Sequence, residues 1–551
     1  YIYFDLAAGN VNIGKTTYTG YVFVNGTQTK VTGQHKAENK YYVYQSNSKN
    51  KSETGYVSDD FNKTKCRIPE YTRVHTNVDV EGKTVSTKWT NFITNNTDVY
   101  DVSTKWADAA KASDREGTSN YITFSSESDY AVDMTVDNIW STRHENRVNR
   151  TTGGIGADLR QNKNTTIRLR LKGDNRVGCV HYSAERNYKN QIIFSNGEGA
   201  DLEPGSITVA DFPNQWGYNH WNAAIGSCDN NCDRSDGIVI DSGVIYAGTT
   251  WEDNCTAIGG GGNAYGGVTI NGGTVTAVAA TTGTAIGGGI GWGSQGGDAK
   301  VTINAGTVYA YNLGIGSKST DNYGQYVPAV AIGGGSSRDA NGNTSTEVTI
   351  KGGNVYAQSM GGAAIGGGGS TKQKGGSANI NISGGTIIAK STEGTFYSED
   401  ISAGVSIGGG TGKTGGGTVK LTISEESGKK TILRTGSIGG GKTTGTGNIG
   451  SAKVNISGGD ITGQVIMAGT GDENNYCEFT MTGGSIHDTN VIDGNTIENQ
   501  YNDPKPDVKI QYLEKNGGAV WMDDSIGVTT ITGGTIEKCT AYRGGAVYMT
   551  G

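Results

Sequence analysis

A ten-residue phrase recurs through the second half of this chain. Residues 268–277 read VTINGGTVTA, and the phrase returns with changes at residues 301, 348 and 380. Each copy is followed, after a spacer of variable length, by a short element of the type Ala-Ile-Gly-Gly-Gly, as at residues 285–289. Val and Ile take alternate positions of the phrase, which is typical of a β-strand with one buried face.

Paired glycines separate these short strands. They indicate bends through positive φ, which costs a residue with a Cβ atom about 1 to 2 kcal/mol and suits glycine. Short strands with glycine turns, repeated about every 28 to 46 residues, are typical of a β-solenoid whose coils stack on one another. Parallel crossovers are almost always right-handed. The sequence therefore predicts an all-β protein built around a right-handed parallel β-helix.

The isoleucines of the Ala-Ile-Gly-Gly-Gly elements are expected to form one internal ladder with a rung about every 4.8 Å. The predicted rungs are Ile258, Ile286, Ile332, Ile365 and Ile407. At about 25 to 30 residues per coil, the residues from 120 onward would make about 14 to 17 coils.

The composition of the chain argues against several classes of protein. The 551 residues include 90 Gly but only 6 Pro and no Gly-X-Y period, so collagen is excluded. The net charge of −7 and the lack of basic runs argue against a nucleic-acid partner. No stretch of 18 apolar residues occurs, so no membrane span is expected. The chain starts with Tyr1 and stops within a repeat, so we expect a piece of a longer protein.

Residues 1–116 lack the phrase, and we expect them to form a β-rich N-terminal cap or a separate binding module. Aromatic and β-branched residues at 18–26 and 40–45 predict strands. Val99, Val102, Trp106 and Ala109 have helical spacing and predict one short helix. Residues 117–551 are then the β-helix with loop insertions, continuing beyond residue 551.

The region around residues 216–255 concentrates chemically distinctive side chains. Aromatic rings stack on sugars, so a glycan could bind at Trp216, Tyr218, Trp221 and Trp251. The alternative is that these rings only cover the side of the solenoid.

Cysteines and acidic residues in the same region suggest two further features. A disulfide is predicted between two of Cys228, Cys232 and Cys255, with free thiols and zinc as the alternatives. The second feature is a weak calcium site. Its ligands would be the side-chain oxygens of Asp229, Asn231 and Asp233, which stand at alternate positions, although no bidentate Glu follows at the usual distance. No other cofactor is expected.

The sequence does not contain a recognisable catalytic set. Hydrolases of β-helical architecture need two carboxylates about 6.5 to 9.5 Å apart, with basic partners. The six histidines are isolated in the sequence, and the pair Asp523 and Asp524 is not followed by His or by Arg-Ile-Lys. We therefore predict no catalytic residues.

From about residue 220 to 551 the chain resembles the glycine-rich right-handed β-helix repeats of very large surface proteins of Gram-positive bacteria. The Gly-Gly-Ala-Val-aromatic elements at residues 517 and 544 are similar to the Gly-Gly-Ala-Ile repeats of polymorphic outer-membrane adhesins. This resemblance implies a secreted protein displayed on the cell surface.

Together these observations favour a non-catalytic extracellular protein that acts as an adhesin, a stalk or a fibre-forming element. Its partners would be a glycan or protein receptor on a host or neighbouring cell, or further copies of itself. The alternative is a carbohydrate-binding β-helix module, and a polysaccharide lyase or hydrolase comes third.

Overall fold

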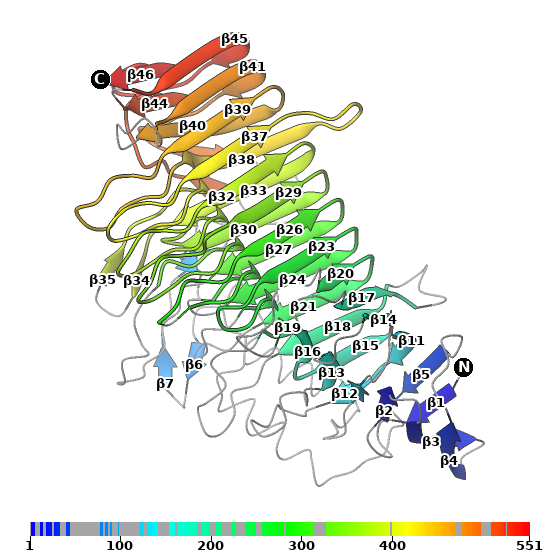
Figure 1. Cartoon of the computed structure of the whole chain (residues 1–551). Coiled ribbons are helices and arrows are strands. Elements are labelled where there is room, and N and C mark those ends of the chain that lie inside the picture. The colour runs from blue at the N-terminus through cyan, green and yellow to red at the C-terminus, as the bar shows by residue number, and fades with distance from the viewer. Residues whose placement is uncertain are drawn as a thin grey trace.

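In the computed structural model of this chain, the described residues form strands joined by turns and loops (Figure 1). The structure describes residues 2–5, 11–14, 18–24, 27–33, 40–44, 78–80, 83–85, 89–90, 97–98, 122–125, 130–141, 154–159, 164–184, 190–197, 204–210, 223–227, 237–248, 256–279, 283–291, 293–312, 327–396, 399–468, 476–497, 508–524 and 526–550. Within these ranges the strands wind into a parallel β-helix, so the predicted fold class is confirmed.

Each regular coil contributes one two-residue strand and two longer strands. In one coil these are β22 (Ile258–Gly259), β23 (Gly266–Ile270) and β24 (Thr274–Ala279). Each pairs in parallel with its counterpart in the next coil, namely β25 (Ile286–Gly287), β26 (Ala299–Ile303) and β27 (Thr307–Asn312). Three sheets therefore run along the rod, and we call them the glycine corner, the β23 sheet and the β24 sheet.

The β23 sheet is the longest ladder. Its fourteen strands are β1 (Ile2–Asp5), β5 (Lys40–Tyr44), β11 (Tyr130–Asp137), β14 (Thr165–Lys172), β17 (Asn190–Asn196), β20 (Ile238–Ile240), β23, β26, β29 (Thr346–Ile350), β32 (Ala378–Ile382), β37 (Val419–Ile423), β39 (Ala452–Ile456), β41 (Glu478–His487) and β45 (Val528–Glu537). At about 4.8 Å per strand this ladder is about 60 Å long.

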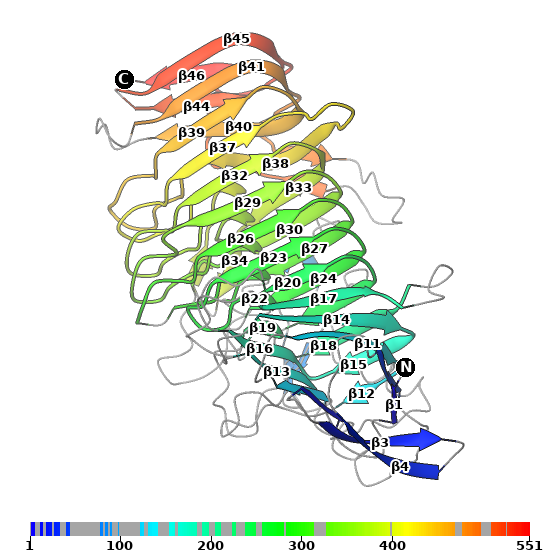
Figure 2. The same ribbon diagram turned by 45° about the vertical axis from the view of Figure 1, so that its right-hand side comes forward.

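The other two sheets follow the same order along the rod (Figure 2). The β24 sheet contains β12 (Trp140–Ser141), β15 (Asp174–Val177), β18 (Ser206–Ala210), β21 (Val244–Gly248), β24, β27, β30 (Asn354–Met360), β33 (Gly385–Thr392), β38 (Thr431–Gly439) and β40 (Asp460–Ala468). The glycine corner contains β2 (Val11–Gly14), β10 (Ile122–Ser125), β13 (Ile155–Leu159), β16 (Val180–Ala184), β19 (Ile225–Ser227), β22, β25, β28 (Ile332–Gly333), β31 (Ile365–Gly366), β36 (Ile407–Gly408), the ends of β38 and β40, β44 (Val520–Asp523) and β46 (Val547–Thr550).

Five antiparallel hairpins lie outside these sheets in the described part of the chain. They are β3–β4 (Tyr18–Val24, Thr27–Gly33), β6–β7 (Val78–Val80, Lys83–Val85), β8–β9 (Trp89–Thr90, Thr97–Asp98), β34–β35 (Gly394–Phe396, Glu399–Ile401) and β42–β43 (Asn495–Ile497, Val508–Ile510). The last two are insertions into the repeat.

Two sequence predictions need correction. The parallel sheet begins at Ile2 rather than at residue 117, because β1 pairs with β5, β5 with β11, and β2 with β10. From β11 onward the β23 sheet has twelve strands rather than 14 to 17, because the insertions make the coils longer than the assumed 25 to 30 residues. The predicted helix at Val99, Val102, Trp106 and Ala109 lies outside the described residues.

The predicted isoleucine ladder is confirmed. Its rungs are in register from coil to coil, and each side chain is completely buried: Ile225, Ile258, Ile286, Ile332, Ile365, Ile407 and Ile438. Inward Val and Ile residues of the two long sheets complete a continuous apolar core. Burying an aliphatic side chain contributes about 1.5 to 3 kcal/mol, so this core is the main source of stability.

One glycine in each of the seven coils from β19 to the end of β38 explains the corner there. Gly366, which follows the rung Ile365, has φ of +153°. A Cβ atom on Gly366 would lie 1.8 Å from the carbonyl oxygen of Gly408 in the next coil. The equivalent glycines of six other coils have φ between +140° and +155° (Gly226, Gly259, Gly287, Gly333, Gly408 and Gly439). In these coils the corner therefore requires glycine both for its conformation and for the close approach of the next coil.

Beyond this corner, two glycine-rich segments of each coil between residues 260 and 450 pack backbone against backbone, and we call this region the glycine ridge. Gly297 N–H donates to Gly289 O at 2.7 Å within one coil, and Gly335 N–H of the next coil donates to Gly297 O at 2.8 Å. The same zigzag continues from Gly410 N–H to Gly376 O at 2.9 Å and as far as Gly450. Side chains are replaced here by direct backbone contact between coils.

Gly366→Ala should destabilise the protein by about 3 kcal/mol or more, because the methyl group meets a backbone oxygen and the φ value is unsuited to alanine. Gly293→Ala is the matched control, because a Cβ atom there would meet nothing within 4 Å. Urea or thermal unfolding of both variants measures the difference. Equal unfolding midpoints would show that the corner contact is not tight.

Candidate functional site

The predicted binding, metal and disulfide residues all lie outside the described residues. These are Trp216, Tyr218, Trp221, Trp251, Asp229, Asn231, Asp233, Cys228, Cys232 and Cys255. The glycan, calcium and disulfide hypotheses based on them stay predictions. The candidate site is therefore built from the outer faces of the solenoid.

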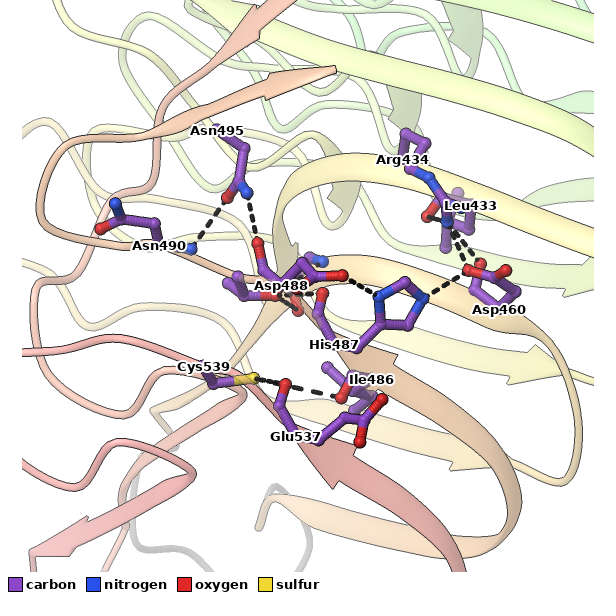
Figure 3. A network of polar contacts seen from close by, with 12 residues as sticks. Leu433, Arg434, Asp460, Ile486, His487, Asp488, Asn490, Asn495, Glu537 and Cys539 are labelled. Atoms are coloured by element: carbon purple, nitrogen blue, oxygen red, sulfur yellow. Dashed lines mark hydrogen bonds and ion pairs between the residues drawn. The ribbon is translucent and has the colours of Figure 1, made fainter. Parts of the chain in front are cut away.

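A cluster of charged side chains joins three consecutive coils near the C-terminal end of the rod (Figure 3). Arg434 projects from β38, Asp460 begins β40, and His487 ends β41. Asp488 follows His487 with φ of +53°, which turns the chain and brings its carboxylate beside the imidazole. The parallel stacking of the strands places these side chains on one outer edge.

The imidazole of His487 is held at both nitrogens. Nε2 lies 2.6 Å from Asp460 Oδ1, and Nδ1 lies 2.7 Å from Asp488 Oδ2. Arg434 Nη1 donates to Asp460 Oδ1 at 2.7 Å and to the backbone oxygen of Asp460 at 2.9 Å. The Arg434 side chain is only 13% exposed and that of His487 20%.

The charged groups of the cluster stabilise one another's ionised forms. Burial acts to lower the pKa of His487, but the hydrogen bonds that its ring N–H groups donate to Asp488 and Asp460 outweigh burial, and the pKa is raised above 6.5. Burial acts to raise the pKa of Asp460, but Arg434 and His487 hold it below 3.8. An imidazole with both nitrogens bound to carboxylates has no free lone pair for proton abstraction. The cluster is a clamp between coils rather than an acid–base pair.

The outer face of the β24 sheet carries aromatic residues in its middle coils. Tyr309 and Tyr356 are in register, and their rings stack with centroids 4.8 Å apart and an interplanar angle of 9°. Although strand alternation turns them outward, Tyr356 is 1% exposed and Tyr311 is 2% exposed. This face is therefore covered by other parts of the same chain.

Lys390 lies on this covered face, in register with Gln358, and is only 7% exposed. No hydrogen bond or ion pair joins its ammonium group to any residue in the described ranges. Burial lowers the pKa of Lys390 to about 8. A perturbed lysine is chemically notable, but within the described ranges no acid or second base accompanies it to make a catalytic pair.

The outer face of the β23 sheet is polar and accessible. One outward row reads Thr269, Thr302, Thr349, Asn381, Thr422, Asn455 and Thr480 along successive coils. In the neighbouring row Asn304 Nδ2 donates to Asn271 Oδ1 at 2.8 Å, and Asn271 Nδ2 donates to Asp241 Oδ1 at 2.9 Å. This face offers hydroxyl and amide groups at the strand spacing.

Other chemically active groups have structural partners. Asp524 accepts hydrogen bonds from the backbone N–H groups of Cys477 and Ile526, and Asp523 accepts one from the Thr550 hydroxyl. Within the described ranges, Cys477 and Cys539 are free thiols. In the same ranges no group of three His, Cys, Asp or Glu residues is placed to hold a metal ion. The described part also has no helix long and apolar enough to cross a bilayer.

Comparison with known proteins adds nothing to this chemistry. No family model, curated protein or solved structure matches the chain. Sequence reasoning treated His487 as isolated, because its partners Arg434 and Asp460 come from other coils. Only knowledge of the strand register could have brought them together.

His487→Gln should remove a pH-dependent part of the stability. The raised pKa of His487 means that its contribution is complete below its ordinary pKa of 6.5 and is lost as the pH rises through the folded value. The lowered pKa of Asp460 means that its contribution is present above 3.8 and is lost as the pH falls further. The free energy of unfolding of the wild type should exceed that of the variant most between about pH 4 and 6.5.

Urea unfolding of both proteins across this range measures the difference. Glu537→Gln is the control, because Glu537 is in register with His487 but makes no hydrogen bond to its ring in the described structure. A wild-type advantage over His487→Gln that does not vary with pH would contradict the clamp.

Lys390→Met should stabilise the protein at neutral pH, because it removes an unpaired buried charge. The folded-state pKa of about 8 is below the ordinary 10.5, so the folded protein disfavours the protonated amine. The wild type should gain stability relative to the variant as the pH rises from about 8 to 10.5. Unfolding midpoints at several pH values test this, and a difference that is constant with pH would show that Lys390 is solvated.

Proposed function

We propose that this protein is a non-catalytic, extracellular surface protein in which the β-helix is a rigid spacer or adhesive rod. The observation that carries the proposal is the in-register parallel stack, which runs without interruption from β1 to β45 in the β23 sheet. A stack of this kind supplies length and stiffness, since each regular coil bonds to the next through all three sheets.

Three features support stiffness. The isoleucine ladder is fully buried, so sliding one coil against the next would break its register. The glycine ridge replaces flexible side-chain contacts by backbone hydrogen bonds of 2.6 to 3.1 Å. Interlocking pairs such as Arg170 with Asp133, at 2.6 and 2.8 Å, tie neighbouring coils on the outside.

Two features support a role in contact with other molecules. The outer face of the β23 sheet displays repeated hydroxyl, amide and charged groups. The hairpins β34–β35 and β42–β43 are insertions beside the regular coils, and such loops often carry recognition. The resemblance to bacterial surface repeats supports a location outside the cell, with a glycan or protein receptor or further copies as partners.

Beads coated with the purified chain test this proposal. We expect them to adhere to bacterial or host cells more than beads coated with the heat-unfolded chain. We also expect the chain to release no reducing sugars or unsaturated products from a panel of polysaccharides. Turnover of any polysaccharide would contradict a non-catalytic role, and equal adhesion of both bead types would contradict an adhesive one.

A further inference from the structure

Two coils of the C-terminal half carry an unusual excess of positive charge. Residues 403–456 contain seven Lys and Arg residues but only two Glu, although the whole chain has a net charge of −7. Every residue of this stretch is described. The excess is therefore a local property of the coils that contain β37 and β39.

Both acidic side chains of this stretch lie in the loop that connects β37 to β38, and both accept hydrogen bonds there. Glu425 accepts a hydrogen bond from the backbone N–H of Thr431 at 3.1 Å. Glu426 accepts hydrogen bonds from the Ser383 hydroxyl at 3.0 Å and from Lys429 Nζ at 2.9 Å. Neither carboxylate is placed to neutralise the lysines of the sheet.

Some of the basic residues also have partners. Arg434 pairs with Asp460 in the clamp, and Lys442 Nζ donates to the Ser402 hydroxyl at 2.8 Å while facing the charge of Glu514. Four exposed lysines have no carboxylate oxygen within 4 Å of their ammonium groups in the described structure. We call them the lysine band: Lys413, Lys420, Lys430 and Lys453.

The register of the strands arranges the band across the rod. Lys420 in β37 and Lys453 in β39 are directly paired, so their Cα atoms lie about 4.8 Å apart on the outward face. Lys413 precedes β37 on the side of the glycine ridge, and Lys430 follows it in the loop that projects beyond the neighbouring turns (Figure 1). The band therefore follows the strand direction.

An aromatic ring and neutral polar groups border the band. Lys453 Nζ lies 4.3 Å from the centroid of the Tyr476 ring, which is half-buried. Thr422 and Asn455 are in register two residues beyond the paired lysines and project from the same face. Exposed ammonium groups, an aromatic ring and hydroxyl or amide groups together suit a sugar polymer that carries negative charges.

We propose that the lysine band binds an acidic polysaccharide. Carboxylate or sulfate groups of the polymer would pair with Lys420 and Lys453, and a sugar ring would pack against Tyr476. Glu347 and Glu478 stand in the same outward row on either side, so the positive surface is about two coils wide. This narrow surface on an acidic protein favours a single flexible chain over duplex nucleic acid. The inference rests on the proposed function, because a surface without catalysis retains its ligand.

Binding of the full chain to polygalacturonate and to dextran sulfate, with neutral dextran as reference, tests the proposal. The double variant Lys420→Gln with Lys453→Gln should bind both acidic polymers about tenfold more weakly at low salt. Lys300→Gln is the matched control, since Lys300 is exposed in the same row but its register neighbours are Gly267 and Glu347, so no second lysine stands beside it. Its affinity should equal that of the wild type.

Tyr476→Ala separates sugar recognition from simple charge attraction. It should weaken binding of the acidic polysaccharides and leave any binding of duplex DNA unchanged. The proposal is overturned if neither acidic polymer binds, if the double variant binds like the wild type, or if DNA binds as tightly and Tyr476→Ala affects no ligand. Cleavage of a bound polymer would instead contradict the non-catalytic function while supporting the binding site.

Discussion

The close approach of glycine backbones at the corner determines the rest of the structure. At Gly333 and Gly366 a Cβ atom would meet the next coil's carbonyl oxygen at 1.9 and 1.8 Å, so these coils contact each other without intervening side chains. One fixed point per coil also fixes the register of the residue before it, which is why Ile332 and Ile365 fall directly over each other. Once that rung is set, strand alternation decides which residues of the two long sheets point into the core and which point outward.

The outward rows are free to change along the rod, and their chemistry does change. In the early coils, ion pairs such as Arg168 with Asp241 at 3.1 Å link one strand to a later one. The middle coils of the β24 sheet carry the stacked Tyr309 and Tyr356, covered by other parts of the chain. Further along the rod, an outward row of the β23 sheet carries the exposed pair Lys420 and Lys453. The common interior thus supports different surfaces at different heights, which suits a rod that presents several contact regions.

The sequence predicts most strongly where local rules apply. Alternating Val and Ile with paired glycines is a local pattern, and both the parallel β-helix and the isoleucine ladder follow from it. The pairing of β5 with β11 could not be predicted from the sequence, because more than eighty residues separate the two strands and neither contains the repeated ten-residue phrase. Insertions of unequal length likewise conceal that Arg434, Asp460 and His487 meet, since the spacing between coils is not constant. The number of coils was overestimated for the same reason.

The insertions and the repeat are structurally dependent on each other. Tyr311, Gln358 and Lys390 occupy one outward row of the β24 sheet. In the next coil this row has Gly436, which follows Thr435, the register partner of Ala389. A Cβ atom there would lie 2.8 Å from the carbonyl oxygen of Gln511, which belongs to the insertion after β41. Leu513 N–H donates to the Ser437 hydroxyl at 2.9 Å, which fastens the insertion to β38. The loop can cross the sheet only because the row loses its side chain at that point. The close backbone contact that builds the corner in the coils from β19 to β38 thus also seats an insertion on the outside of the rod.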